Sequence, residues 1–419
     1  MLKPLSLILS SVVRRGNLTF VDPDGAVHHF GDGNDPAVRI EIADRRLEWH
    51  LALDPEMAAG EGYMSGRLRV TQGTIYDFIA LMMGNLADRP FPAYAQVLAK
   101  LRGWVRPIAQ FNPARRATRN VRHHYDIDPR IYDLFLDPDR QYSCAYFSEP
   151  GMSLADAQAA KKRHIAAKLS LIPGQRVLDI GSGWGGLALY LARAANADVT
   201  GVTLSEEQIR IARERTQSAR LANPPRFELR DYRKVEGTFD RIVSVGMFEH
   251  VGLPHYKTFF ATMARLLAPN GVGLLHTIGR TDKPAATNPF IARYIFPGGY
   301  IPALSEIMTA VEATGLIVCD VEVLRLHYAE TLLAWRRRFL ANRPAAVGIA
   351  GEEFCRMWEF YLAGAEASFR FQNFVVFQIQ LARRIDATPV TRDYMAVVER
   401  ALPLVMGDGD RPKGIAAGR

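Results

Sequence analysis

A glycine-rich loop between an apolar run and a helical pattern restricts the fold of this chain more than any other feature. Residues 177–186 read VLDIGSGWGG, in which Gly181, Gly183 and Gly186 satisfy the spacing G-x-G-x-x-G. The loop follows a β-like run and precedes a helical pattern over residues 187–195. Glycines in this position let the backbone approach a nucleotide closely. The loop therefore predicts a nucleotide-binding α/β domain, and both dinucleotide enzymes and methyltransferases use such a loop.

The two strand ends around the loop help to separate these classes. Asp179 lies two residues before the first glycine, at the end of the first β-like run. The second run ends in residues 201–205, GVTLS, with no acidic residue at its tip. NAD enzymes place an acid there to hold the ribose diol. The pattern favours S-adenosylmethionine over NAD, and a tight structural turn without a ligand is the least favoured reading because the glycines are so dense.

Strand-like and helix-like segments alternate around the loop. Apolar β-like runs cover 176–180, 198–203, 239–245 and 271–278, and helical patterns cover 187–195 and 205–219. This alternation predicts βαβ units and a parallel sheet. Further along, residues 351–383 are rich in Phe, Trp and Tyr and predict a long helical pair.

The N-terminal part follows a different pattern. A first helix is expected over 5–13, and a helix over 74–86 has Thr74 as its N-cap. Between them, short strands are expected over 17–21, 26–30, 38–42, 47–53 and 66–70. These elements predict a small α+β unit.

Basic residues gather in two segments that also contain large aromatics. The formal net charge of +8 favours an anionic partner, either nucleic acid or a membrane surface. Residues 100–122 hold seven basic residues and no acidic one. The second cluster consists of Arg336, Arg337, Arg338 and Arg343, with Trp335 and Phe339 beside them. Aromatics among cations fit an anionic lipid surface, and the sequence has no nucleic-acid-binding module motif. A solvated linker and a solvated helix face are the alternatives.

Cysteine content and hydropathy restrict the setting. Cys144, Cys319 and Cys355 are too few and too scattered for a structural zinc site. A reduced, cytosolic environment is the default for such a chain. No run of 18 apolar residues occurs. We therefore expect a cytoplasmic protein without a bound metal, peripheral on the inner face of the membrane.

Motifs along residues 10–400 carry a resemblance to a known family. In order, they are GEGYMSGRLRVTQGTIYDFI in the N-terminal part, and then HHYDIDPRIYDLFLD, QYSCAYF, LDIGSGWGG, GVTLSEEQ, DYR, VSVGMFEHVG, LLHTIG, HYAETL and RMWEFYLAGAEASFR. In these motifs the sequence resembles the cyclopropane fatty-acyl-phospholipid synthases and the mycolic-acid cyclopropane synthases, and the N-terminal motif is similar to the small lipid-side domain of the longer bacterial synthases. Two departures are visible: Ser182 stands where the family loop often has Cys, and residues 128–131, DPRI, replace the family's small residues and Asn-Asp-Phe.

The resemblance implies a domain organisation. The fold class is α/β, a class I methyltransferase with a Rossmann-like sheet and helical lipid-side insertions, preceded by a small N-terminal α+β domain. We expect this lipid-side domain over 1–105 and a basic linker over 106–120. The S-adenosylmethionine-dependent catalytic domain is expected over 121–400, and a disordered tail over 401–419.

The resemblance also implies a reaction, the transfer of a methylene from S-adenosylmethionine to a cis double bond of phospholipid acyl chains to form a cyclopropane. An alkene is a weak nucleophile, so positioning supplies much of the catalysis. The resulting carbocation must be kept from water, and a base must take one proton from the transferred methyl. In the family this base is a bound bicarbonate. Its expected ligands are Cys144, Glu249, His276, the main chain of Ile278, and Tyr328.

The expected donor site follows from the same motifs. Its residues are Tyr142, Ser143, Asp179, Gly181, Gly183, Gly185, Thr203, Leu204, Gln208, Asp231 and Tyr232. The expected partners are an unsaturated phospholipid and an anionic membrane surface but no nucleic acid, with a homodimer left open. Three alternatives remain: an alkene methyltransferase that leaves a methyl or methylene branch without closing a ring, a small-molecule methyltransferase, and a non-catalytic lipid-binding protein.

Overall fold

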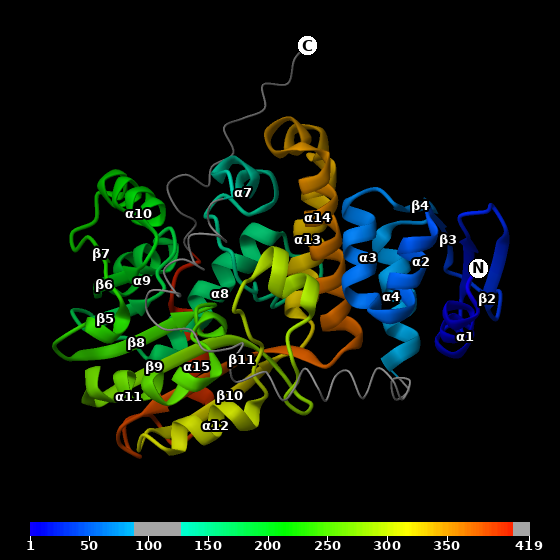
Figure 1. Cartoon of the computed structure of the whole chain (residues 1–419). Coiled ribbons are helices and arrows are strands. Elements are labelled where there is room, and N and C mark those ends of the chain that lie inside the picture. Colours follow the sequence, from blue (N-terminus) through cyan, green and yellow to red (C-terminus); the bar gives the residue numbers. More distant parts are fainter. Residues whose placement is uncertain (88–126, 405–419) are drawn as a thin grey trace, which may run out of the picture. The chain divides into compact units, whose positions relative to one another are not determined.

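The computed structural model describes residues 1–87 and 127–404, and their contacts divide them into two units (Figure 1). The first unit combines residues 1–87 with Ala285–Gly299 and Tyr328–Phe374, and the second combines 127–284, Tyr300–His327 and 375–404. The predicted linker 106–120, the basic segment 100–122 and the tail from residue 405 onward lie outside the described residues. The expected domain boundaries therefore stay a prediction.

The first unit contains a four-stranded sheet with strand order β2-β1-β3-β4. Its strands are β1 (Asn17–Val21), β2 (Val27–Gly31), β3 (Ala37–Ile42) and β4 (Leu68–Gln72). Its helices are α1 (Lys3–Val12), α2 (Arg45–Leu53), α3 (Pro55–Met64), α4 (Ile75–Ala87), α13 (His327–Ala341, from Tyr328) and α14 (Arg343–Phe371), with a π-helical turn at Ile291–Ile295. Alternate residues of β1 and β3 enter the core, where Leu18, Phe20, Val38 and Ile40 are buried.

Two expected elements are wrong. Residues 47–53 form helix α2 rather than a strand, because the Asp44 carboxylate accepts a hydrogen bond from Leu47 N–H at 2.9 Å and caps the helix. Leu47 and Leu51 then lie one helical turn apart, and both are buried. In an apolar run this short, a helical spacing of four residues cannot be told from the alternation of a strand. The second half of the expected helical pair is strand β11 (Phe374–Ala382), because the long helix ends at Phe371.

The second unit is built on a seven-stranded sheet with strand order β10-β11-β9-β8-β5-β6-β7. The strands are β5 (Arg176–Ile180), β6 (Asp198–Thr203), β7 (Arg226–Leu229), β8 (Phe239–Val245), β9 (Leu267–Arg280), β10 (Ile317–Leu324) and β11. β5 pairs in parallel with β6 and β8, β6 with β7, and β8 with β9, whereas β10 and β11 are antiparallel. The predicted parallel α/β sheet is confirmed, with an antiparallel addition at one edge.

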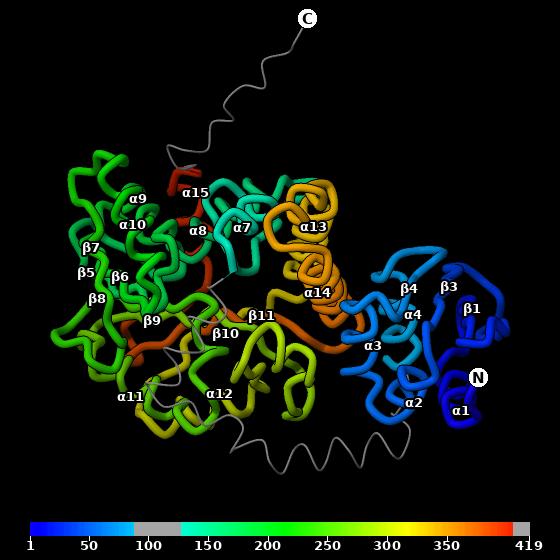
Figure 2. The backbone as a smooth tube through the Cα atoms, turned by 45° about the horizontal axis from the view of Figure 1, so that its top comes forward, coloured from blue at the N-terminus to red at the C-terminus, as the bar shows by residue number. Residues whose placement is uncertain are grey.

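Helices cover both faces of this sheet (Figure 2). The helices of the second unit are α7 (Pro129–Phe135), α8 (Leu154–Leu169), α9 (Gly186–Ala195), α10 (Glu206–Ala219), α11 (Tyr256–Leu266), α12 (Leu304–Glu312) and α15 (Asp393–Ala401), and 3-10 turns occur at Tyr232–Lys234, Phe248–His250 and Leu253–His255. Neighbouring strand residues serve opposite cores: Leu178 packs in the cluster that contains α11, and Val177 packs in the cluster that contains α8 and α9.

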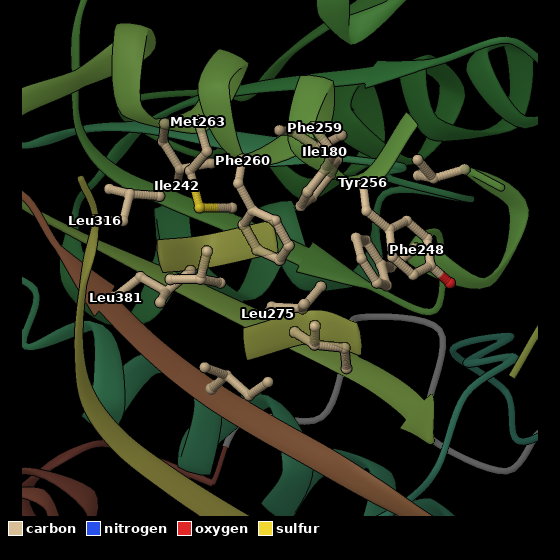
Figure 3. Packing of buried hydrophobic residues seen from close by; sticks show 14 of the residues in the cluster. Ile180, Ile242, Phe248, Tyr256, Phe259, Phe260, Met263, Leu275, Leu316 and Leu381 are labelled. Carbon is tan, nitrogen blue, oxygen red and sulfur yellow. The ribbon is translucent and has the colours of Figure 1, made fainter. Parts of the chain in front are cut away.

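The core on the α11 side is rich in aromatic rings (Figure 3). Phe259 and Phe260 of α11 and Phe248 lie within 5.0–5.4 Å of one another, measured between ring centroids. These three side chains are fully buried. Such packing fixes the segment that follows β8. Because Glu249 directly follows Phe248, its backbone is held in place by the same packing.

Over residues 1–87 and 127–404, we find no helix whose length and apolarity would let it cross a bilayer.

Candidate active site

A cavity lies at the carboxyl ends of β5, β6 and β8, where ligands bind in parallel α/β sheets. Ten of the eleven residues expected to hold the donor line it: Tyr142, Ser143, Asp179, Gly181, Gly183, Thr203, Leu204, Gln208, Asp231 and Tyr232. Gly185 does not line it. All of these residues belong to the second unit.

The three glycines of the loop differ in what surrounds them. All have positive φ, at 84° for Gly181, 53° for Gly183 and 83° for Gly185. A Cβ on Gly185 would lie 2.8 Å from the Phe227 ring, so this glycine permits close packing of the loop. A Cβ on Gly183 would meet no protein atom within 4 Å. Because Gly183 lines the cavity, added bulk there would occupy ligand space.

Asp179 places a buried carboxyl at the cavity wall. Its side chain is 2 % exposed, and Oδ2 has no hydrogen-bond partner in the described part of the chain. Burial raises the pKa of Asp179 to about 7, and the nearby Lys161 charge opposes this rise. A buried carboxylate without partners is costly unless a cation joins it. The Asp179 side of the cavity therefore favours a positively charged group of a ligand.

The tips of β6 and β7 supply the opposite side of the cavity. The Thr203 hydroxyl donates to Gln208 Oε1 at 2.8 Å, which fixes the first turn of α10 next to the strand end. Asp231 lies half-buried; burial would raise its pKa, but hydrogen bonds from the side chain and amide of Arg233 lower it. Tyr232 presents its ring edge-on to Phe259 at 5.5 Å.

Glu249 and Ile278, two of the expected catalytic residues, are in direct contact. The Ile278 amide donates to Glu249 Oε1 at 2.6 Å. The other carboxylate oxygen, Oε2, is buried and makes no hydrogen bond of good geometry within the described residues. Burial raises the pKa of Glu249 to about 7. The carboxyl therefore titrates near neutral pH, as a group that exchanges protons should.

His276 and Cys144 are both buried in the second unit, at 2 % and 1 % exposure. The amide nitrogen of Gln378 lies 3.1 Å from His276 Nδ1. Since this nitrogen is a donor, Nδ1 accepts and the ring proton sits on Nε2. Burial lowers the pKa of His276 well below its ordinary value, so the ring is neutral. The Cys144 thiol donates to the Ala145 carbonyl at 3.3 Å. None of the four expected catalytic residues in this unit, Cys144, Glu249, His276 and Ile278, lines the donor cavity.

Tyr328 belongs to the first unit. Its ring packs against Phe369 at 4.8 Å and edge-on against Trp335 at 5.7 Å.

The basic cluster of α13 differs from the expectation that its aromatics meet a lipid surface. Trp335 and Phe339 are fully buried. Arg336 pairs with the buried Glu366 at 2.9 Å and lies 4.2 Å above the Tyr76 ring. These contacts exist because the face of α13 that carries Trp335, Arg336 and Phe339 packs against the core of the unit. A run of three arginines in the sequence does not show which of them faces that core.

The other cations of the cluster are divided in the same way. Arg343 pairs with Glu352 at 2.6 Å. Arg337 and Arg338 are exposed. Of the four arginines in this cluster, Arg337 and Arg338 are therefore the two whose exposure fits contact with a lipid surface.

Among the cavity-lining residues that sequence reasoning missed are Lys161, Trp184 and His250. Lys161 is 1 % exposed although lysines in helices usually face solvent, and its sequence context, AAKKRH, gives no signal of burial. Trp184 packs edge-on against Tyr132 at 5.3 Å, and its place inside the glycine loop is a sequence signal that could have found it. Burial lowers the pKa of His250 to about 4, so it is a neutral wall residue.

Comparison with known proteins gives the family. A family model described as "Mycolic acid cyclopropane synthetase" matches residues 112–379. The chain belongs to this family. It is 37% identical over 356 residues to the cyclopropane-fatty-acyl-phospholipid synthase of Escherichia coli, covering 85% of this chain and 90% of that protein. The resemblance predicted from the motifs is confirmed, and the chain is an enzyme of this family with a methyltransferase fold.

Other members of the cyclopropane synthase family show its range. The chain is 34% identical to the tuberculostearic acid methyltransferase UfaA1 of Mycobacterium tuberculosis, over 87% of this chain and 88% of that protein. Among solved structures, the mycolic acid cyclopropane synthase CmaA1 complexed with SAH and CTAB matches with a TM-score of 0.61 and 34% identity, covering 65% of this chain and 99% of CmaA1. The expected class I methyltransferase fold is thereby confirmed.

Proposed function

We propose that this protein transfers a methylene from S-adenosylmethionine to a cis double bond of phospholipid acyl chains and closes a cyclopropane ring. The observation that carries the proposal is the cavity at the sheet edge, whose walls contain ten of the eleven expected donor residues. The cyclopropane-fatty-acyl-phospholipid synthase of E. coli supports the substrate class. The SAH bound to CmaA1 supports the donor class.

The residues of the cavity have distinct roles in this proposal. The backbone at Gly183 leaves space for the donor, and Asp179 receives its α-ammonium group. Gln208 and Thr203 lie where the ribose and methionine parts would meet the β6 tip. Transfer of the methyl breaks a carbon–sulfur bond and forms a carbon–carbon bond to the alkene, and loss of one proton from that methyl then closes the ring.

The base is the second element of the proposal. A bicarbonate held by Glu249, His276 and Cys144 of the second unit would supply this base; the expected contribution of Tyr328, which belongs to the first unit, stays a prediction. The free oxygen of Glu249 and the Nε2–H of His276 fit an anion that carries its own hydroxyl: the first accepts a hydrogen bond and the second donates one. The amide of Ile278 is already bonded to Glu249 and therefore acts by orienting this carboxyl.

A related reaction is the alternative. A methyltransferase acting on the same alkene would leave a methyl or methylene branch, as the names of UfaA1 and of a probable fatty acid methyltransferase from Pseudomonas putida suggest for those proteins. Product NMR separates the outcomes, because ring methylene protons and exocyclic alkene protons resonate in different regions.

The test uses vesicles of unsaturated phosphatidylglycerol with methyl-labelled S-adenosylmethionine. Label in a cyclopropane methylene supports the proposal, and label in a branch supports the alternative. Label that never enters lipid while S-adenosylhomocysteine still binds would contradict the lipid substrate.

The same proposal includes an anionic membrane surface as partner, with the protein peripheral on the cytoplasmic side. Arg337 and Arg338 are the exposed cations of the α13 cluster that support it. A homodimer also stays a prediction, and analytical ultracentrifugation tests it directly.

A further inference from the structure

Lys161 has an unusual environment for a lysine. It lies on α8, its side chain is 1 % exposed, and it lines the donor cavity. Its Nζ donates to Gln141 Oε1 at 2.6 Å and to Ser143 Oγ at 2.9 Å. Lysine has three N–H donors and no acceptor, so both oxygens must accept.

These hydrogen bonds determine which atoms of the neighbouring groups accept and which donate. Since Ser143 Oγ accepts from Lys161, its own hydroxyl proton is free to be donated elsewhere, and Ser143 lines the cavity. The Ser143 carbonyl is held by Gln158 Nε2 at 2.9 Å, so the segment is fixed from both sides. A hydrogen-bond acceptor in the cavity would therefore find a preoriented hydroxyl.

Charge is divided across the cavity in a way that matches an amino acid. Asp179 offers a buried carboxyl, and Lys161 offers a buried ammonium. Burial lowers the pKa of Lys161 to about 8, which leaves the group cationic at neutral pH. The nearby Asp139 already has other partners, Lys162 at 2.6 Å and Arg215, and does not need Lys161 for neutralisation.

We propose that Lys161 is a positioning residue of the donor site, which directs the Ser143 hydroxyl and a positive charge toward the α-carboxylate of the donor. The inference rests on the proposed function, because it assumes a donor with an amino-acid end. In this arrangement the α-ammonium meets Asp179 and the α-carboxylate meets Ser143 and Lys161. Recognition of both charged groups on the α-carbon fixes this end of the donor and thereby orients the sulfonium at the other end of the same side chain.

The test compares two ligands by calorimetry. S-adenosylhomocysteine carries the amino-acid end, whereas 5′-methylthioadenosine lacks it. Lys161→Met should weaken S-adenosylhomocysteine by about 10- to 100-fold and methylthioadenosine by less than about twofold, since only the first loses charged hydrogen bonds. Lys161→Arg should restore part of the selectivity, because it keeps the charge.

Lys162→Met is the matched control. Lys162 is the adjacent buried lysine of α8, but it bonds to Asp139 and does not line the cavity. Its removal should lower thermal stability while the affinity ratio of the two ligands stays at the wild-type value. If Lys161→Met does not fold, Ser143→Ala should show the same selective loss.

Failure of the Lys161 proposal and failure of the proposed function would give different results. Equal losses for both ligands in Lys161→Met, or no loss, would mean that Lys161 only supports the fold, for example as a counter-ion of Asp137, a buried carboxyl whose charge acts on Lys161. A wild-type protein that binds neither ligand would instead contradict the proposed function.

Discussion

Removing the charge of Asp179 should make the donor-free protein less sensitive to pH. In the folded state, burial raises the pKa of this carboxyl from 3.8 to about 7. The folded protein therefore holds the proton more tightly than the unfolded chain does. Folding stability must fall as pH rises from about 4 to about 7, because ionisation costs more in the folded state.

The magnitude follows from the size of the shift. A change from 3.8 to about 7 corresponds to about 4 kcal/mol at full ionisation, at 1.36 kcal/mol per pKa unit. Between pH 5 and pH 8 the part of this cost that develops is about 2.5 kcal/mol. Asp179→Asn removes this titration, while groups that do not interact with Asp179 titrate alike in both proteins and cancel in the difference.

Urea denaturation of both proteins at pH 5 and pH 8, without donor, measures the effect. The free energy of unfolding of Asp179→Asn relative to wild type should rise by about 2.5 kcal/mol between these two pH values. Saturating S-adenosylhomocysteine at pH 8 should stabilise wild type more than the variant, since its ammonium pairs with the carboxylate. Parallel pH curves for the two proteins would refute the reasoning.

Three further predictions follow from the same cavity and surface. Gly183→Ala should weaken donor binding and lower stability by about 1 kcal/mol because its φ is positive. Gly185→Ala carries the same backbone cost and also collides with a buried ring, so it should lower stability by about 2 kcal/mol more; equal melting temperatures of the two variants would contradict this division. Glu249→Gln should lose most turnover but keep donor affinity, and wild-type turnover should fall in bicarbonate-stripped buffer; indifference to bicarbonate would remove it as the base. Reversing Arg337 and Arg338 to Glu should weaken the binding free energy to phosphatidylglycerol vesicles, measured by sedimentation, by about 1 kcal/mol per residue. Equal binding of the wild-type protein to neutral and anionic vesicles would contradict this electrostatic docking.

Local sequence was sufficient for the donor loop and the central strands. Glycine spacing determines a turn that few other residues allow, and Gly181 and Gly183 take positive φ as such a turn requires. Apolar runs of strand length determine buried parallel strands, and the tips of such strands meet at one edge of the sheet. The position of Asp179 at a strand end therefore placed it at the cavity before any contact was known.

The tertiary structure alone decided which charges are buried and paired. Asp44 could be recognised as a helix cap only after residues 45–53 proved helical. Arg336 meets Glu366, 30 residues away, and Lys161 meets Ser143, 18 residues away. The environment of a charged side chain depends on partners remote in the chain, because burial is set by how elements pack and not by neighbours in sequence. For this reason the local sequence determined the glycine-rich nucleotide-binding loop and the parallel sheet, whereas the tertiary structure decided which charged side chains face a ligand.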